Sequence, residues 1–324
     1  WMYSLQNVEQ NLLFGYGAAD EVRKKLITLW NVYSFYATYA AVDGFDPIKN
    51  ALKLDALSVL DKWVIAKTHL LIKNADQSLD TFRADNFMKK FEVYLEELSN
   101  WYIRRNRRRF WKSEDDEDKK SAYATLYHVL DNVIRIIAPV LPFVSESIYQ
   151  NLIRNSDKNS LESVHLCDFP ISNEEYINMG LIKNVDALKK SVELGRSARN
   201  NSDVRIRQPL SKALFAMEDD KVSKFIIDNQ DIVLDELNVK SIERITEADQ
   251  LIEYKIKPNL RTLGKKYGKG LSKIKSILDE SSPVMLVKEL KEKNLIMLDN
   301  NKYQLEREDV FIETIATEGF QQQV

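Results

Sequence analysis

The feature that most constrains this chain is the spacing of apolar residues in its first half. They recur every three or four positions in residues 20–40, 54–74, 82–110 and 120–137. This spacing gives each helix one apolar stripe, and successive helices of this kind bury their stripes against one another. Pro139 ends the fourth segment and Pro142 begins a short fifth helix, because proline is tolerated in the first turn of a helix but not in its interior. The first half is therefore predicted to be an α-helical bundle.

The pattern changes after residue 170. One helix is expected at residues 181–199, and two more at 221–236 and 270–293. Alternating apolar and polar residues, typical of strands, occur in residues 204–217, 241–245, 253–257 and 295–316. Asp299-Asn300-Asn301, within the last of these, is typical of a hairpin turn. We therefore predict a mainly α, multidomain chain, with a helical bundle in residues 1–175 and a small α+β domain in residues 181–324.

Composition excludes several classes of protein. Only 9 Gly and 7 Pro occur in 324 residues, which disfavours a β-sandwich or barrel. The single Cys167 rules out an internal disulfide, and His69, His128 and His165 lack the spacing of a zinc site. No apolar run reaches the roughly 18–20 residues of a membrane span, and no signal peptide is recognisable. These observations predict no metal site and a cytoplasmic protein.

No motif for catalysis stands out. The GxSxG, GxGxxG and HExxH patterns do not occur, so we assign no catalytic residue. The 47 basic and 49 acidic side chains give a formal charge of -2, so any surface for a polyanion must be local. The first residue is Trp1 rather than Met, and we therefore expect the chain to be part of a longer protein.

The most unusual segment is NWYIRRNRRRFW, residues 100–111. Five arginines fall in residues 104–109, and aromatic residues flank them on both sides. Arginine neutralises phosphate and aromatic rings stack on unpaired bases, so this composition suits a nucleic acid with splayed bases. The candidate RNA-binding residues of this segment are Trp101, Arg104, Arg107, Arg108 and Trp111.

A helical wheel of residues 87–111 separates the arginines into two groups. Arg105 and Arg109 continue the buried stripe, so we expect them to pair with acidic groups inside the bundle. The other three arginines and Trp111 project from the opposite side, and Trp101 lies at the border. This second group is predicted to be free for an external anion.

An intramolecular interpretation stands beside the nucleic-acid one. A charged helix is often only a solvated face, and the acidic run at residues 114–118 can neutralise the arginines within the chain. The residues by themselves leave these two interpretations equally open. The acidic run is more typical of a solvated loop and a helix N-cap than of a metal site.

Two further basic segments are candidates for RNA contact. KKYGKG, residues 265–270, combines three lysines with glycines that let backbone N–H groups approach a phosphate, although the segment is slightly more typical of a flexible surface loop. In VRIRQPLSK, residues 204–212, the two arginines share one face if the strand is regular, which is either a third contact or only an exposed face. The candidate residues here are Arg205, Arg207, Lys265, Lys266 and Lys269.

Several segments together resemble class I aminoacyl-tRNA synthetases. LWNVYSFYATYA (29–40), LDKWVIAKTHLLI (60–72), the arginine-rich helix and IIAPVLPFVSESIYQNL (136–152) are similar to the anticodon-binding bundle shared by the isoleucine, valine, leucine and methionine enzymes. RSARNNSDVRIRQPLSKALF (196–215) and YKIKPNLRTLGKKYGKG (254–270) resemble the isoleucyl family of the eukaryote-like type. The ordered agreement extends over residues 24–270 in several blocks.

The resemblance implies a fold and a partner. The fold would be an anticodon-binding helical bundle followed by a small α+β domain. The partner would be tRNA(Ile). The protein would be a monomer that binds neither DNA nor a membrane. The HIGH-like and KMSKS-like motifs of this family do not occur here. The resemblance therefore implies a C-terminal part that is inactive alone and needs no cofactor, while ATP and Mg serve the parent enzyme.

Two alternatives remain beside this interpretation. In one, the bundle is a structural module that orients a catalytic domain, and its arginines form internal salt bridges. In the other, the chain is the equivalent domain of a valyl- or leucyl-tRNA synthetase. The valine enzyme is expected to end in a coiled-coil arm, and no such heptads are seen here.

Overall fold

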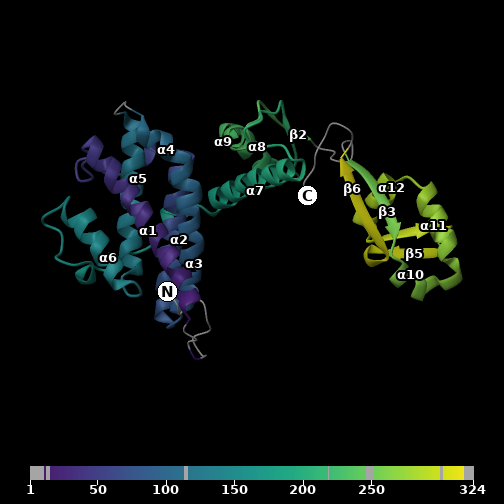
Figure 1. Cartoon of the computed structure of the whole chain (residues 1–324), viewed down its shortest axis with the longest axis horizontal. Coiled ribbons are helices and arrows are strands. Elements are labelled where there is room, and N and C mark those ends of the chain that lie inside the picture. Colours follow the sequence, from purple (N-terminus) through teal and green to yellow (C-terminus); the bar gives the residue numbers. More distant parts are fainter. Residues whose placement is uncertain are drawn as a thin grey trace. The chain divides into compact units, whose positions relative to one another are not determined.

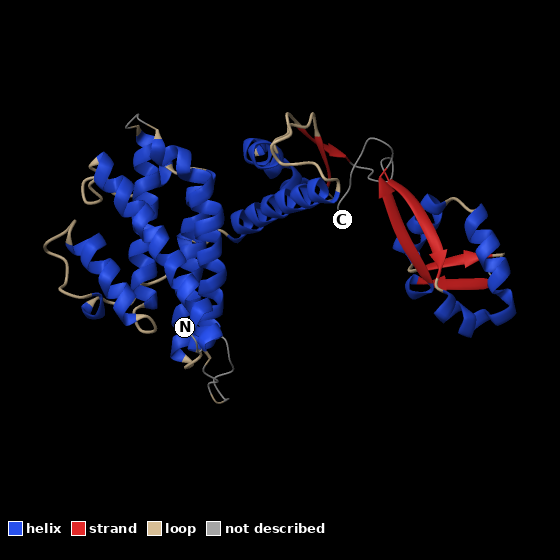
Figure 2. Cartoon of the chain, in the orientation of Figure 1, coloured by secondary structure: helices blue, strands red, loops and turns tan. Residues whose placement is uncertain are grey.

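A computed structural model describes residues 11, 15–112, 116–217, 219–245, 252–299 and 302–316. It separates into two units, Trp1–Lys183 and Asn184–Val324. The first unit is helical, whereas the second combines helices with short strand pairs (Figure 2). The predicted fold class, a helical bundle followed by an α+β part, is confirmed. No helix of the described ranges is long and apolar enough to cross a lipid bilayer.

The first unit is a bundle in which α5 (Glu117–Ile137) packs against four other helices. Those neighbours are α1 (Tyr16–Asp43), α2 (Val59–Asp80), α4 (Arg104–Trp111) and α6 (Pro142–Tyr149), and α3 (Ala84–Glu97) packs against α2 (Figure 1). The core between them is rich in aromatic residues. Its largest fully buried side chains include Trp63, Phe87, Phe91, Tyr102, Phe110 and Tyr123. The apolar stripes of the sequence therefore face one another, as predicted.

Local sequence determines where these helices begin and end. The Ser58 hydroxyl accepts the backbone N–H of Asp61 at 3.2 Å, and the Asp61 carboxylate accepts that of Ser58 at 3.0 Å, which closes a capping box at the start of α2. Asp116 caps α5 by accepting the N–H of Lys119 at 2.8 Å. Gly44 ends α1 at φ 64°, a left-handed conformation that glycine adopts without steric cost.

The segment from α3 to α4 is one continuous path with a π-helical turn at Leu98–Ile103. A π turn holds more residues than an α turn, so the face that points into the core shifts along the sequence. As a result three successive residues, Trp101, Tyr102 and Ile103, are all buried. The same shift places Asn106 and Phe110 in the core rather than on the flank.

The second unit begins with α7 (Met179–Asn201), whose first turn belongs to the first unit. A parallel pair follows, β1 (Ala213–Ala216) with β2 (Ile242–Ile245), and the crossover between them carries α8 (Asp220–Asp228) and α9 (Gln230–Leu237). Two predictions are wrong in detail here. The helix expected at 221–236 is interrupted at Asn229, and only the last part of 204–217 forms a strand.

The rest of the second unit has its own hydrophobic core. An antiparallel pair, β3 (Ile252–Pro258) with β6 (Val310–Ala316), and a hairpin, β4 (Leu295–Leu298) with β5 (Tyr303–Glu306), are accompanied by α10 (Leu260–Tyr267), α11 (Leu271–Glu280) and α12 (Pro283–Lys293) (Figure 1). Leu263, Ile274, Ile296 and Leu305 are completely buried among them.

The hairpin that joins β4 to β5 is confirmed, with Asp299 in the left-handed region at φ 54°, while Asn300 and Asn301 lie outside the described residues. The single helix expected at 270–293 is wrong. Pro283 begins a new helix instead, because its ring disfavours a helical residue before it and its nitrogen has no hydrogen to donate.

Candidate nucleic-acid interface

The arginine-rich helix is anchored in the bundle by Asp61, which is fully buried. The Asp61 carboxylate accepts hydrogen bonds from the Tyr102 hydroxyl at 2.6 Å and the Ser58 hydroxyl at 2.8 Å. The guanidinium of Arg109 donates to both carboxylate oxygens at 2.9 Å, a bidentate ion pair. Asp61 therefore joins the start of α2 to the end of α4.

Arg109 is largely withdrawn from solvent, with 14% of its side chain exposed. Burial by itself would lower the pKa of Arg109, but the hydrogen bonds and charge of Asp61 outweigh it and raise that pKa. A second carboxylate, Asp118, lies 2.8 Å from the same guanidinium. The prediction that Arg109 pairs with acidic groups at the end of the bundle is confirmed.

The acidic segment after α4 also neutralises a lysine. The Lys112 ammonium lies 2.6 Å from the Asp116 carboxylate and 3.0 Å from that of Asp118. For Lys112 and Arg109 the intramolecular interpretation of the basic segment is therefore correct. Arg105 is half-buried, and its pairing with an acidic group stays a prediction.

The opposite face of α4 is open to solvent. Arg107 and Arg108 are exposed, Trp111 is 55% exposed, and Arg104 is half-buried with its Nε donating to the Asn100 carbonyl at 2.9 Å. Arg107 makes no hydrogen bond or ion pair within the part of the chain that the structure describes. Positions 104, 107, 108 and 111 share one helical face, so a cationic and an aromatic group are presented together.

Trp111 packs against a series of aromatic rings that leads into the bundle. Its ring centroid lies 6.3 Å from that of Tyr39 on α1, and Tyr39 lies 5.0 Å from Phe35. Phe35 in turn contacts Phe110 edge-on at 5.1 Å, which brings the series into the bundle core. Sequence analysis missed Tyr39, because no pattern within one helix reveals a ring supplied by another.

Trp101 does not belong to this face, which corrects its assignment as a stacking residue. Only 7% of its surface is exposed. The physical reason is the π-helical turn, which rotates Trp101 into the core together with the two residues that follow it. A base cannot stack on this ring in the observed conformation.

Arg205 and Arg207 lie in a loop rather than in the regular strand expected for them. Both side chains are exposed. Residues 204–209 form turns, because Pro209 cannot donate to a strand partner and because Arg199 binds the carbonyl oxygens of Arg205 and Gln208. The two arginines therefore remain available to a ligand, although the face-sharing argument that proposed them was wrong.

The KKYGKG segment is not an open phosphate loop. Lys265 and Lys266 belong to the last turn of α10, and Lys266 lies 2.8 Å from the fully buried carboxylate of Asp309. Lys266 is thus occupied within the chain, which corrects its assignment as an RNA contact. Lys265 is exposed, and the side chain of Lys269 lies outside the described residues.

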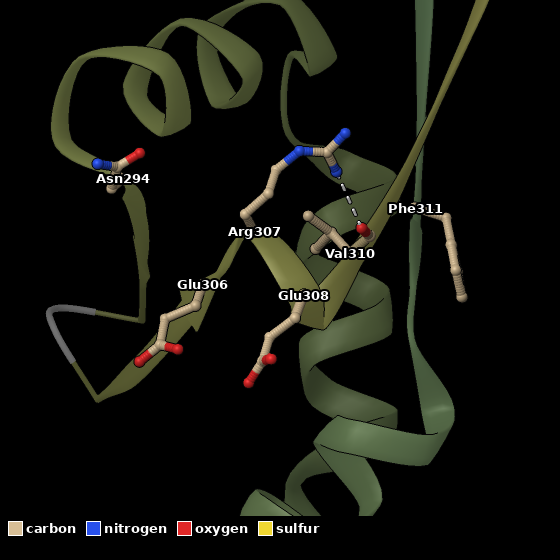
Figure 3. A pocket seen from close by; sticks show the side chains of 6 residues that line it. All are labelled: Asn294, Glu306, Arg307, Glu308, Val310 and Phe311. Atoms are coloured by element: carbon tan, nitrogen blue, oxygen red, sulfur yellow. Dashed lines mark hydrogen bonds between the residues drawn. The ribbon is translucent and has the colours of Figure 1, made fainter. Parts of the chain in front are cut away.

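A shallow hollow in the second unit carries mixed charge, as Figure 3 shows. The Glu306 and Glu308 carboxylates line it together with Arg307, whose guanidinium donates to the Val310 carbonyl at 3.4 Å. Two carboxylates against one arginine disfavour a phosphate ligand here. The hollow therefore contributes nothing to a nucleic-acid interface.

Two of the three histidines meet in the bundle, which the sequence did not indicate. His69 on α2 and His128 on α5 place their Nε2 atoms 3.2 Å apart, and the Nδ1 of His69 accepts the backbone N–H of Asn173 at 3.1 Å. Burial lowers the pKa of His69 to about 4, with the neighbouring His128 as a smaller cause. Across the described ranges no cluster of three or more metal-binding side chains occurs.

Comparison with known proteins identifies what this chain is similar to. Residues 61–214 match a family model described as the anticodon-binding domain of tRNA ligase. Over 92% of its length the chain is 41% identical to isoleucine–tRNA ligase of Clostridium tetani, and over 93% it is 40% identical to that of Clostridium kluyveri. The enzyme of Protochlamydia amoebophila is 36% identical over 92% of the chain.

The chain spans only 28–29% of the length of these relatives. The matched domain begins at Asp61, the carboxylate that anchors the arginine-rich helix, and it includes the outer face of α4 and the loop with Arg205 and Arg207. The resemblance to the isoleucyl family is confirmed. The chain contains an anticodon-binding domain of the tRNA ligase family and is homologous, over most of its length, to part of isoleucine–tRNA ligase.

Proposed function

We propose that this chain binds the anticodon stem-loop of tRNA(Ile), and that the outer face of α4 is the main contact. The observation that carries this proposal is the pairing of an unengaged cation, Arg107, with an exposed indole, Trp111, one helical turn away. The anticodon-binding family of residues 61–214 and the isoleucine–tRNA ligases among its relatives support the choice of ligand.

The chemistry of this face suits a loop of RNA. Arg107 neutralises a phosphate, while Arg104 and Arg108 add positive potential on the same side of the helix. Trp111 stacks on an unpaired base, and Tyr39 and Phe35 hold its ring in place. A preorganised ring loses little side-chain freedom on binding, so more of the stacking energy appears as affinity.

The proposal extends to the second unit and to the longer protein. Arg205, Arg207, Lys265 and Lys269 are further candidates for phosphate contact, and Trp101 and Lys266 are not. In a full-length ligase, ATP and Mg would serve the aminoacylation reaction in a part that this chain lacks, and the chain alone would need no cofactor. We further propose that the protein is a cytoplasmic monomer.

The test is a titration of the chain with tRNA(Ile), compared with the same tRNA carrying a swapped anticodon. R107A is expected to reduce the slope of log K against log salt by about 0.7–0.9, the share of one phosphate contact. W111A is expected to lose about 1–3 kcal/mol of binding free energy.

The matched control is R23A. Arg23 is exposed and pairs with Asp20 near the other end of α1, about 24 Å along that helix from Tyr39. Binding that is unaffected by R107A and W111A, or reduced equally by R23A, contradicts the proposal. Failure to bind either tRNA would favour the structural module, in which the basic residues act only within the protein.

A further inference from the structure

Arg199, near the end of α7, is a buried cation whose described partners are all backbone carbonyls. It is 5% exposed. Its guanidinium donates to the carbonyl oxygens of Arg205 at 3.1 Å, Gln208 at 2.9 Å and Asn238 at 3.0 Å. No carboxylate of the described residues lies within ion-pair distance of it. A buried charge needs hydrogen-bond partners, and here three backbone carbonyls accept from the guanidinium.

These bonds hold both ends of one loop, residues 204–210. At its start, the Val204 N–H donates to the Arg199 carbonyl at 2.9 Å. At its end, the Leu210 N–H donates to the Asn238 carbonyl at 3.1 Å, and the Asn238 amide reaches back to the Ile206 carbonyl at 3.0 Å. The loop is thus fastened to α7 on one side and to the end of α9 on the other.

The inward orientation of the carbonyls leaves the cationic side chains outside. Arg205 and Arg207 are exposed, and so is Lys240, whose backbone N–H donates to the Leu210 carbonyl at 3.0 Å. None of the three has an ion pair among the described residues. Lys212, two residues beyond the loop, is different because it pairs with Glu243 at 2.7 Å. The loop therefore presents a group of unneutralised cations on a fixed backbone.

We propose that Arg199 is a positioning residue, which fixes the loop of residues 204–210 so that Arg205 and Arg207 meet the phosphate backbone of an RNA. This inference rests on the proposed function, because it takes the same tRNA as its ligand. Arg199 itself does not contact the RNA, since it is buried and its described hydrogen bonds all go to backbone carbonyls of this chain. A loop ordered in advance avoids the entropy cost of ordering it on binding.

The test measures the salt dependence of tRNA(Ile) binding by the full chain and its variants. The R205A/R207A double variant is expected to reduce the slope of log K against log salt by about 1.4–1.8, the share of two phosphate contacts. R199M is expected to reduce the slope in the same direction. Adding R199M to R205A/R207A is expected to change the slope no further, because a positioning residue acts only through the residues that it positions.

Two milder variants keep the test informative if R199M fails to fold. R199K retains the charge and three donors, and is expected to restore part of the lost slope. N238G preserves the left-handed backbone at φ 48° but removes the amide bond to Ile206, so it is expected to weaken binding in the same direction.

The outcomes separate this inference from the proposed function. A wild-type slope for R199M, R199K and N238G, beside a reduced slope for R205A/R207A, overturns the positioning role. An unchanged slope for R205A/R207A, beside a reduced one for R107A, overturns the loop contact but leaves the proposed function in place. Unchanged slopes for R107A and R205A/R207A overturn the proposed function itself.

Discussion

Arg109 in the bundle and Arg199 in the second unit are both withdrawn from solvent, but their surroundings differ. Arg109 forms a bidentate ion pair with the fully buried Asp61, whereas the described partners of Arg199 are backbone carbonyl oxygens. Both belong to basic segments whose composition suits RNA. The carboxylate fixes the end of a helix to a core, and the carbonyls fix the path of a loop.

This difference shows that the arginines of one basic segment can have different roles. In each segment the buried arginine builds the scaffold and its exposed neighbours remain for a ligand. The two scaffolds should respond differently to substitution. Loss of a buried carboxylate leaves a charge without compensation, while loss of a cation that binds carbonyls releases a loop at the surface.

The largest effect is expected from D61N, which breaks the ion pair of the bundle. The neutral amide leaves the partly exposed Asp118 as the described carboxylate partner of Arg109, and it removes strong acceptors from Tyr102 and Ser58. The free energy of unfolding is expected to fall by about 3–5 kcal/mol. Denaturant unfolding followed by circular dichroism measures it.

The matched control for this prediction is D55N. Asp55 is exposed, and its replacement is expected to change the free energy of unfolding by no more than about 0.5 kcal/mol. Equal effects of D61N and D55N would show that Asp61 does not anchor the arginine-rich helix.

A smaller effect is expected in the second unit from K266M, with its neighbour as the control. Lys266 pairs with the fully buried Asp309, whereas Lys265 makes no ion pair among the described residues. K266M leaves the Asp309 carboxylate without its cation and should lower the melting temperature more than K265M does. Equal melting temperatures for K266M and K265M in a thermal unfolding experiment would show that Lys266 does not stabilise the fold.

A pH-dependent effect is expected from the two histidines of the bundle, which are held neutral. The unfolded-state pKa of histidine is about 6.5, and burial lowers that of His69 to about 4. Burial also lowers the pKa of His128. Between these values the unfolded chain binds more protons than the folded one, so the free energy of unfolding falls as pH falls from about 6.5 to 4.

Unfolding titrations at several pH values measure this loss. H69Q is expected to flatten the dependence, and H165Q, at an exposed position, is expected to leave it unchanged. If the free energy of unfolding depends on pH equally in the wild type, H69Q and H165Q, the His69–His128 pair is not the source of that dependence.

Much of the fold could be predicted because apolar spacing within a helix reports its buried face. The bundle, the β4–β5 hairpin and the pairing of Arg109 all follow from patterns local to one segment. The errors arise where distant residues decide. A π-helical turn buries Trp101, the Arg199 guanidinium turns an alternating segment into a loop, and Asp309 takes up Lys266.

The smallest effect on stability is expected at the outer face of α4. R107A removes a side chain that projects into solvent, so it should change the free energy of unfolding by no more than about 0.5 kcal/mol. W111A also loses the aromatic contact with Tyr39, so it should cost slightly more, about 0.5–1.5 kcal/mol. Both should nevertheless weaken RNA binding. A large loss of stability in either variant would place these residues in the scaffold, together with Arg109.

The most direct measurement is the tryptophan fluorescence of the chain during a titration with tRNA(Ile). Trp111 is 55% exposed and Trp30 is 41% exposed, while Trp63 and Trp101 are buried. Stacking of a base on Trp111 should quench its emission, so W111F should lose most of the quenching and W30F should retain it. Equal quenching in W111F and the wild type would contradict the assignment of the α4 face as the anticodon contact.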